Sequence, residues 1–154
     1  MGVTNIAMHL HLRVETLFLL DRTTMSHPNL MSVCPEGRSV TCTQRGSNRM
    51  MVLGSRGFST GVHYWEVHVD AAAWGSVFIG VCPAQSRPWN GYGLINYRAI
   101  QQFGNERLYG HHFSAGDTIG VLLDMNQGRM SFFRDGMDLF AAKFTAVNMG
   151  IAFR

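Results

Sequence analysis

The chain has 154 residues, of which 46% are hydrophobic and only 15% are charged. Its length fits one domain with a real hydrophobic core, and its composition excludes a disordered chain, which would be poor in apolar residues and rich in charge. Thirteen basic and ten acidic residues leave a net charge of +3. This excess is too small to indicate nucleic acid as a partner by itself, and we do not expect one.

Three cysteines, Cys34, Cys42 and Cys82, form no Cys-x-x-Cys pair. An odd number of cysteines without metal-ligand spacing is typical of reduced thiols in a cytosolic protein. The sequence also contains no signal segment and no run of about 18 apolar residues. We therefore expect a soluble cytoplasmic protein that does not contact a membrane.

The first predicted element lies in residues 1–19, where Ile6, Leu10 and Val14 recur at spacing four. This spacing favours a helix, although the segment fits an unassigned leader equally well. From Ser39 onward, short apolar or alternating segments separated by turn residues predict antiparallel strands. These strands are expected over residues 39–43, 50–53, 63–69, 76–82, 117–124, 129–134 and 149–153.

Two of these segments carry detailed patterns. Along residues 63–69, Trp65, Val67 and Val69 alternate with polar or half-polar neighbours, so we expect these three side chains to face the core. Residues 125–128 read Met-Asn-Gln-Gly between two apolar segments. Asn and Gly supply turn chemistry, which predicts a hairpin between residues 118–124 and 129–133.

Five short segments carry sequence signatures. Residues 20–30 open with Leu-Asp and end with Pro-Asn-Leu, residues 61–67 read Gly-Val-His-Tyr-Trp-Glu-Val, and residues 76–81 read Ser-Val-Phe-Ile-Gly-Val. Residues 116–124 read Gly-Asp-Thr-Ile-Gly-Val-Leu-Leu-Asp, and residues 131–136 read Ser-Phe-Phe-Arg-Asp-Gly. In this order they resemble the SPRY domain with its preceding PRY segment, which is found in butyrophilins and tripartite-motif ubiquitin ligases. One departure is Asp135, which stands where the family usually has Asn.

The resemblance implies an all-β fold, a twisted two-sheet antiparallel β-sandwich of the concanavalin-like jelly-roll type. It implies a PRY-SPRY-like domain over residues 20–154, after a leader over residues 1–19. The family normally continues into one or two further strands, so we expect this domain to lack its last strand or strands. A sheet edge left open in this way favours self-association.

Residues with catalytic or metal-binding chemistry form no recognisable site in the sequence. A closed zinc site needs four converging ligands, and neither the alternating His9 and His11 nor the adjacent His111 and His112 supply them. No Gly-x-Ser-x-Gly, His-Glu-x-x-His or Gly-x-x-x-x-Gly-Lys motif occurs. We therefore expect no enzyme activity, catalytic residue, metal or cofactor in this chain.

Residues 87–112 form the most ligand-like segment, because they concentrate aromatic, arginine and polar side chains where the strand pattern lapses. Such residue types on loops supply much of the binding energy of protein interfaces. By resemblance, this segment is a variable connection that contributes to the family's binding face. The candidate partner-binding residues are Trp89, Asn90, Tyr92, Tyr97, Arg98, Gln101, Arg107, Tyr109 and His111.

A secondary basic patch is expected from Arg45, Arg49 and Arg56, which lie in a stretch without acidic residues. Arginines in such a stretch could meet a phosphate or an acidic peptide. A solvated basic edge beside one strand explains the same pattern.

The resemblance further implies a non-catalytic module that recognises a protein or peptide through loops at one end of the sandwich. We interpret the chain as the substrate-selecting domain of a ubiquitin ligase, and as a fragment of that larger protein, whose catalytic parts would lie elsewhere. Two alternatives stay open. One is a scaffold or adaptor domain unrelated to ubiquitin, and the other is a lectin-like sandwich that binds a small ligand.

Overall fold

The computed structural model describes the backbone of residues 8–13, 19–42, 50–71, 77–82, 92–95, 99–102, 105–108 and 112–139. Side chains are described for residues 19–42, 50–70, 77–82, 94 and 112–139. Within these ranges the chain forms thirteen strands and one short 3-10 helix. The part of the chain that is described contains no helix long and apolar enough to cross a membrane.

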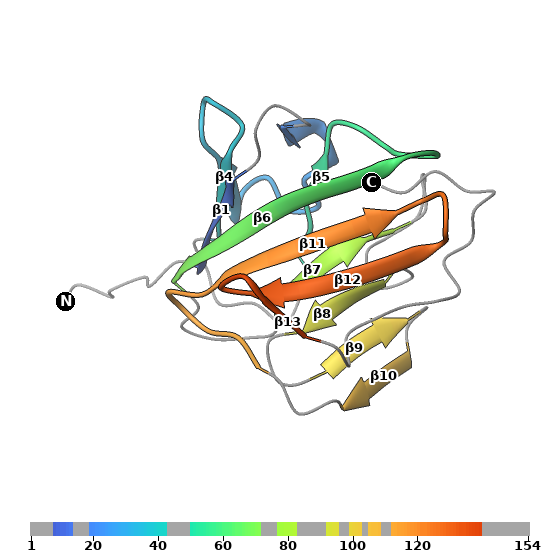
Figure 1. The fold of residues 1–154 in the computed structure, drawn as a ribbon. Coiled ribbons are helices and arrows are strands. Elements are labelled where there is room, and N and C mark those ends of the chain that lie inside the picture. The colour runs from blue at the N-terminus through green and yellow to red at the C-terminus, as the bar shows by residue number, and fades with distance from the viewer. Residues whose placement is uncertain are drawn as a thin grey trace.

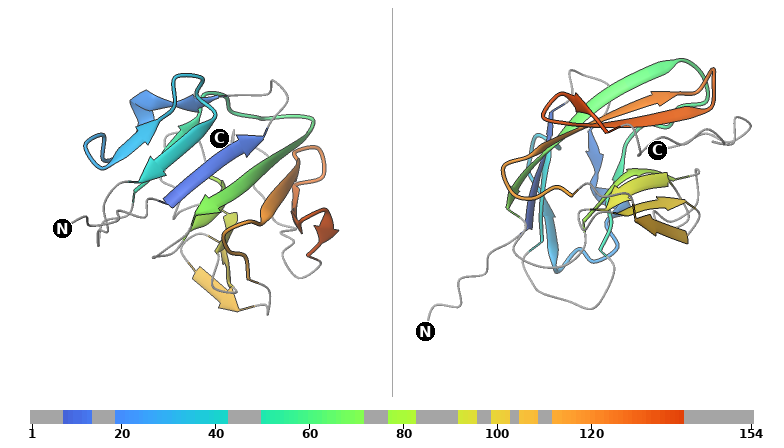
Figure 2. Two further views of the ribbon diagram at one scale, coloured as in Figure 1. Left: turned by 90° about the vertical axis from the view of Figure 1, so that its left-hand side faces the viewer. Right: turned by 60° about the horizontal axis from the view of Figure 1, so that its bottom comes forward.

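The larger sheet has seven antiparallel strands in the order β13-β12-β11-β6-β1-β4-β3. In the left view of Figure 2, β4, β1, β6 and β11 lie side by side across this sheet. The strands are β1 (Met8–Arg13), β3 (Met31–Val33), β4 (Ser39–Cys42), β6 (Val62–Ala71), β11 (Thr118–Asp124), β12 (Arg129–Arg134) and β13 (Met137–Asp138).

A second sheet has four antiparallel strands in the order β10-β9-β8-β7. In Figure 1, β7 lies behind β11 and β12, and β9 and β10 lie below them. A two-stranded pairing and a 3-10 helix complete the described elements. Together the two main sheets form the predicted antiparallel sandwich, so the predicted all-β fold class is confirmed. The remaining elements are β7 (Phe78–Val81), β8 (Tyr92–Ile95), β9 (Ala99–Gln102), β10 (Asn105–Leu108), β2 (Leu20–Asp21), β5 (Leu53–Gly54) and η1 (Arg22–Thr24).

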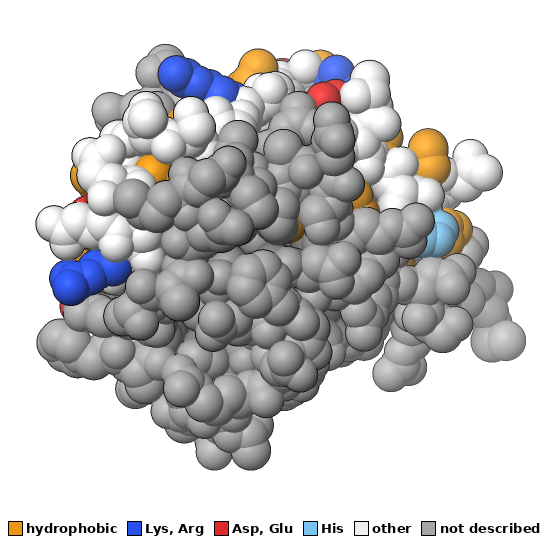
Figure 3. Space-filling view, turned by 90° about the vertical axis from the view of Figure 1, so that its right-hand side faces the viewer, with side chains coloured by type: hydrophobic (Ala, Val, Ile, Leu, Met, Phe, Trp, Pro, Cys, Tyr) orange, Lys and Arg blue, Asp and Glu red, His pale blue; other side chains and the backbone are white. Residues whose placement is uncertain are grey.

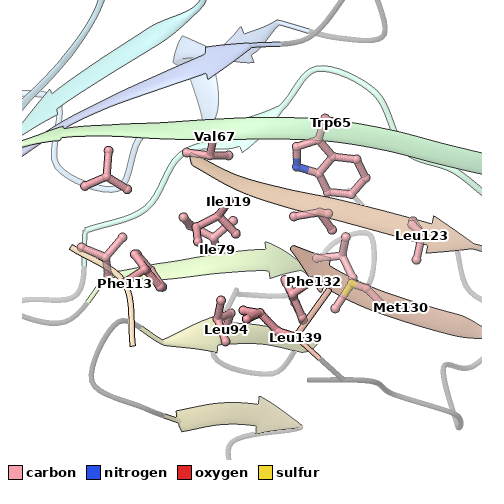
Figure 4. Packing of buried hydrophobic residues seen from close by; sticks show 14 of the residues in the cluster. Trp65, Val67, Ile79, Leu94, Phe113, Ile119, Leu123, Met130, Phe132 and Leu139 are labelled. Carbon is pink, nitrogen blue, oxygen red and sulfur yellow. The ribbon is translucent and has the colours of Figure 1, made fainter. Parts of the chain in front are cut away.

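The main core lies between the two sheets and contains apolar side chains from both (Figure 4). Trp65 is only 5% exposed, which confirms the predicted core face of β6. On the facing sheet, Ile79 and Leu94 are buried against it. Full burial of side chains of this size stabilises the fold by roughly 1.5–3 kcal/mol each. The buried cluster comprises Phe58, Trp65, Val67, Val69, Val77, Ile79, Val81, Leu94, Phe113, Ile119, Val121, Leu123, Met125, Met130, Phe132 and Leu139.

The predicted hairpin between β11 and β12 is present, with Asp124 paired to Arg129. The carboxylate of Asp124 accepts a hydrogen bond from the backbone N–H of Gln127 at 2.9 Å. Gly128 closes the turn with a positive φ of 64°, a conformation that glycine adopts at little cost. The local turn chemistry therefore positions these two strands as the sequence indicated.

The helix expected near the N-terminus is wrong over residues 8–13, which form β1 between β4 and β6. Two periodicities compete in this segment. The spacing of Ile6, Leu10 and Val14 suits a helix, whereas Leu10 and Leu12 alternate with polar residues. The strand register pairs Leu10 with Val69 and Leu12 with Val67, two buried positions, so pairing with β6 favours the two-residue period.

Two other predicted segments differ from the structure. The strand expected over residues 50–53 is replaced by the short β5, which begins only at Leu53. Residues 87–112, expected to be loop, contain β8, β9 and β10. The strand expected over residues 149–153 lies outside the described residues, and the expected open edge after it stays a prediction.

Candidate functional site

The predicted partner-binding segment coincides with three strands of the smaller sheet. Tyr92 begins β8, Gln101 lies in β9 and Arg107 lies in β10. The figures show β9 and β10 at one margin of the molecule (Figures 1 and 2). The other six candidates, Trp89, Asn90, Tyr97, Arg98, Tyr109 and His111, lie outside the described residues.

The register of these strands separates the three described candidates into two rows. Gln101 pairs with Gly93 and Glu106. Tyr92 pairs with Gln102, while Arg107 pairs with Ile100, which pairs in turn with Leu94. Residues paired across a sheet share a face, and neighbours along a strand alternate. Tyr92 and Arg107 thus belong to the row of the buried Leu94, and Gln101 belongs to the opposite row.

Of the secondary basic patch, only Arg56 lies among the described residues, whereas Arg45 and Arg49 lie outside them. The guanidinium carbon of Arg56 lies 5.7 Å from the centroid of the Phe58 ring. Phe58 in turn stacks on His63, with centroids 3.9 Å apart and planes at 23°. Such a cation–π contact holds the charge of Arg56 beside an aromatic surface.

The connection before β6 is fixed to the β11–β12 turn by two hydrogen bonds of the Gly61 backbone. The N–H of Gly61 donates to the side-chain oxygen of Asn126 at 2.9 Å, and the N–H of Met125 donates to the carbonyl of Gly61 at 2.9 Å. His63 donates from Nε2 to the carbonyl of Thr60 at 2.7 Å. This end of the sandwich therefore holds Arg56 and His63 in a defined arrangement, which sequence reasoning missed because the contacts are between separate segments.

The described arginines do not gather into one patch on the face drawn in Figure 3. Blue side chains appear there at separate places along the top and the left of the view. Arg56 is exposed at its end of the molecule, while Arg134 donates from Nη1 to the carbonyl of His112 at 2.6 Å. On this face, the described side chains therefore give isolated basic contacts and no broad basic surface of the kind that binds a nucleic-acid backbone.

The outer face of the larger sheet carries a second group of contact-forming side chains, on β6, β11 and β12. Tyr64 is 42% exposed and meets Phe133 edge-to-face, with ring centroids 6.1 Å apart and planes at 74°. Its hydroxyl donates to the carboxylate of Glu66 at 2.9 Å. Burial first, and then the hydrogen bond to Glu66 and its charge, raise the pKa of Tyr64 to about 12. Tyr64 is therefore a neutral, fixed aromatic surface at physiological pH.

A turn near the N-terminal strands holds Cys34 in a polar setting. The backbone N–H groups of Arg38 and Ser39 each donate to its sulfur at 3.2 Å. Burial opposes ionisation of the thiol, but hydrogen bonds from the Ser39 side chain and from these two backbone groups outweigh it and lower the pKa of Cys34. The guanidinium of Arg22 also donates to the Cys34 carbonyl, which fixes the turn against η1.

Comparison with protein families matches residues 62–154 to the SPRY domain. The chain therefore belongs to the SPRY domain family, as its sequence signatures predicted. It is a protein-interaction module of a typically non-catalytic class.

Curated relatives come from the tripartite-motif group. The chain is 34% identical to "Nuclear factor 7, ovary" of Xenopus laevis over 66% of its length, and 32% identical to "Nuclear factor 7, brain" of the same species over 84%. It is 28% identical to "E3 ubiquitin-protein ligase TRIM69" of Rattus norvegicus over 82% of its length. These matches cover 19%, 25% and 26% of the relatives, so the chain spans about a quarter or less of their length.

Among solved structures, the chain is similar to the SPRY domain of human HERC1, with a TM-score of 0.60. The match covers 88% of this chain and 95% of that chain at 20% sequence identity. At this identity the likeness establishes the fold and carries no information on the bound partner.

Proposed function

We propose that this chain is the substrate-selecting domain of a ubiquitin ligase of the tripartite-motif type. The observation that carries the proposal is its similarity to an E3 ubiquitin-protein ligase over 82% of the chain, although it spans only 26% of that ligase. In such an arrangement this domain would hold a protein or peptide, and the transfer of ubiquitin would take place elsewhere in the larger protein. Cys34, Cys42 and Cys82 form no disulfide with one another, which supports a cytoplasmic location.

We further propose that residues 87–112 contribute the main contact surface. Trp, Tyr and Arg give large rigid contact areas and bidentate hydrogen bonds, so a few of them would supply most of the affinity. Our principal candidates there are Trp89, Tyr92, Tyr97, Arg107 and Tyr109. The test uses Trp89, Tyr97 and Tyr109, because Tyr92 and Arg107 belong to the register row of the buried Leu94. Arg56, with Arg45 and Arg49, would instead adjust the association rate and its salt dependence, since exposed charges mainly guide the encounter.

The test begins with a partner identified by proximity labelling in cells and confirmed with the purified chain. Alanine substitution at Trp89, Tyr97 and Tyr109 should weaken binding by at least about 2 kcal/mol at two or more positions, with the melting temperature retained. Arg129→Ala is the matched control, because Arg129 is exposed on β12 at a distance in sequence from the segment. If every variant in residues 87–112 binds the partner normally, while Arg45→Ala and Arg49→Ala abolish binding, the contact surface lies at the other end of the sandwich.

The ligase role needs a separate measurement. Deleting this domain from the full-length natural protein should abolish ubiquitination of the identified partner. A partner that binds but whose ubiquitination is unchanged by the deletion would favour the scaffold or adaptor alternative. Binding to a glycan array without any protein partner would favour the lectin-like alternative.

Self-association through an open sheet edge is a second proposed interaction. It rests on the presence of a single lysine, Lys143, in the whole chain, because charged side chains, lysine above all, protect sheet edges from pairing. Light scattering that shows a monomer at tens of micromolar, on the order of ordinary assay conditions, would contradict it.

A further inference from the structure

Two aromatic rings form a corner on the outer face of the larger sheet, Tyr64 on β6 and Phe133 on β12. Their neighbours Trp65 and Phe132 are buried in the main core, so Tyr64 and Phe133 point away from the smaller sheet. The ring planes meet at 74°, with centroids 6.1 Å apart. Tyr64 is 42% exposed and Phe133 is half-buried, so solvent reaches this aromatic corner.

The Tyr64 ring is held in place from two sides. Gly120 pairs with Glu66 on β6 and with Phe133 on β12, and the ring occupies the space that a side chain at position 120 would fill. The Tyr64 hydroxyl also donates to the carboxylate of Glu66 at 2.9 Å. A surface whose side chains are already ordered loses less conformational entropy when it binds a partner.

Carboxylates lie on both sides of the aromatic corner. In the register of the sheet, Asp138 on β13 pairs with Phe133, and Glu66 lies at the other end of the row that crosses β13, β12, β11 and β6. This row contains two acidic residues and no basic one, in a chain whose net charge is +3. Glu66 accepts one hydrogen bond from Tyr64, whereas a carboxylate can accept about four. The local charge therefore favours a cation.

We propose that the aromatic corner binds an arginine side chain presented by a partner protein or peptide. A planar guanidinium can stack on an aromatic ring and donate to a carboxylate at the same time. With centroids 6.1 Å apart, one cation can lie within about 6 Å of both rings. Trimethyllysine also binds aromatic surfaces, but its ammonium group has no hydrogen to donate to Glu66.

This contact surface is separate from residues 87–112. The strands β8, β9 and β10 of that segment belong to the smaller sheet, which lies across the main core from the aromatic corner. In Figure 1 the strands β11 and β12 lie in front of β7. A partner arginine on this outer face could therefore bind while residues 87–112 hold another molecule.

The experiment titrates the isotope-labelled 154-residue chain with the peptide acetyl-Gly-Leu-Arg-Leu-Gly-amide and follows the backbone amide signals by NMR. The leucines match two apolar neighbours of Tyr64, the 55% exposed Val62 and the paired Leu122. Two matched peptides replace the arginine by citrulline, which has a similar shape without the charge, or by trimethyllysine. We expect shifts centred on Tyr64, Gly120 and Phe133 at millimolar peptide, and binding of the citrulline peptide that is weaker by at least about fivefold.

Substitutions identify the contacts. Glu66→Gln, which removes the charge and retains an acceptor, should abolish the preference for arginine over citrulline. Phe133→Leu, which removes a ring and retains apolar volume, should weaken binding of the arginine peptide by at least about threefold. Asp70→Asn is the matched control, because Asp70 lies on the same strand and face but contacts His68. If Phe133→Leu fails to fold, Glu66→Gln carries the test.

Arg13 of the chain itself is a further control. It pairs with Glu66 in the register of β1 and β6, on the side of Glu66 away from Gly120. Arg13→Ala should therefore retain binding of the arginine peptide. Loss of binding in this variant, equal affinity for the citrulline peptide, or tighter binding of the trimethyllysine peptide would overturn the proposal. Shifts confined to residues 87–112, or no shifts at millimolar peptide, would also overturn it.

Discussion

Tyr64 lies across Gly120 in the neighbouring strand, and its phenol ring occupies the space that a side chain at position 120 would need. A Cβ atom at Gly120 would collide with the Tyr64 hydroxyl oxygen and lie only 2.9 Å from the ring carbon that bears it. The family signature Gly-Asp-x-Ile-Gly thus has a packing reason here: its second glycine gives Tyr64 room to reach both Glu66 and Phe133.

Gly120→Ala is therefore expected to destabilise the fold by about 1–3 kcal/mol, the usual cost of overpacking. Chemical denaturation measures it. In a chain that already carries Tyr64→Ala, the Gly120→Ala substitution should cost little further stability, because the Tyr64 ring with which the new Cβ would collide is absent. A double variant whose loss equals the sum of the two single losses would show that the two residues are not coupled.

Tyr64 should also lower the stability of the fold as the pH rises into the alkaline range. Its pKa is raised from an ordinary value of 10.0 to about 12, so the folded chain retains this proton where the unfolded chain releases it. Stability from this residue is full below about pH 10 and is lost as pH rises towards about 12. The slope of unfolding free energy against pH over this range should become smaller in Tyr64→Phe. An identical slope in both proteins would contradict the assignment.

Trp65 should be the most sensitive position of β6. Truncation of a buried tryptophan to alanine costs about 3–5 kcal/mol, since it leaves a large cavity between the two sheets. Val62→Ala is the matched control, because Val62 lies on the same strand with 55% exposure and should change stability little. Equal midpoints of urea unfolding for both variants would mean that the register of β6 is wrong.

Asp135 has a left-handed backbone, with φ of 49°, in the two-residue turn between β12 and β13. Its carboxylate accepts a hydrogen bond from the N–H of Thr118 at 2.9 Å. Asp135→Asn should keep both features and change stability by less than about 0.5 kcal/mol. Asp135→Ala should cost about 1–2 kcal/mol, because alanine resists this conformation and removes the acceptor. Thermal unfolding of the two variants distinguishes these outcomes.

Cys34 should react with iodoacetamide before the other cysteines. Its lowered pKa gives a larger thiolate fraction near neutral pH, whereas Cys42 is buried and burial raises the pKa of its thiol. Cys82 is only 1% exposed. Mass spectrometry of briefly labelled native protein checks the order, with Cys34→Ser as the control. Labelling of Cys42 at the same rate as Cys34 would contradict the prediction.

The sequence predicted those parts of the fold whose signals are local. Alternation around Trp65 defined the core face of β6, and Asn126 and Gly128 marked the β11–β12 turn. The strands β8 to β10 were missed, because residues such as Gln101, Gln102 and Asn105 show no apolar alternation. Their pairing depends on backbone hydrogen bonds that no side-chain pattern records.

The candidate sites depend even more on contacts between distant segments. Aromatic and arginine content singled out residues 87–112, and their role in binding stays a prediction. The arrangement of Arg56, Phe58 and His63 arises from the folded connection before β6. Likewise, which face the side chains of β8 to β10 occupy depends on strand register, because a one-residue change would move every side chain of a strand to the other face. Neither feature can be deduced from composition.

The central position of β1 also sets an order of events during folding. Among the described strands, β4 and β3 are joined to β6 only through β1. The β11–β12 hairpin closes across a short turn, whereas β1 pairs with β6 only after a long stretch of chain has been brought together. Such non-local pairing is slow, since the entropy of closure is lost before the contacts form. Until β1 has paired with β4 and β6, these two strands both have unpaired edges. The folding chain is most prone to aggregation during that interval.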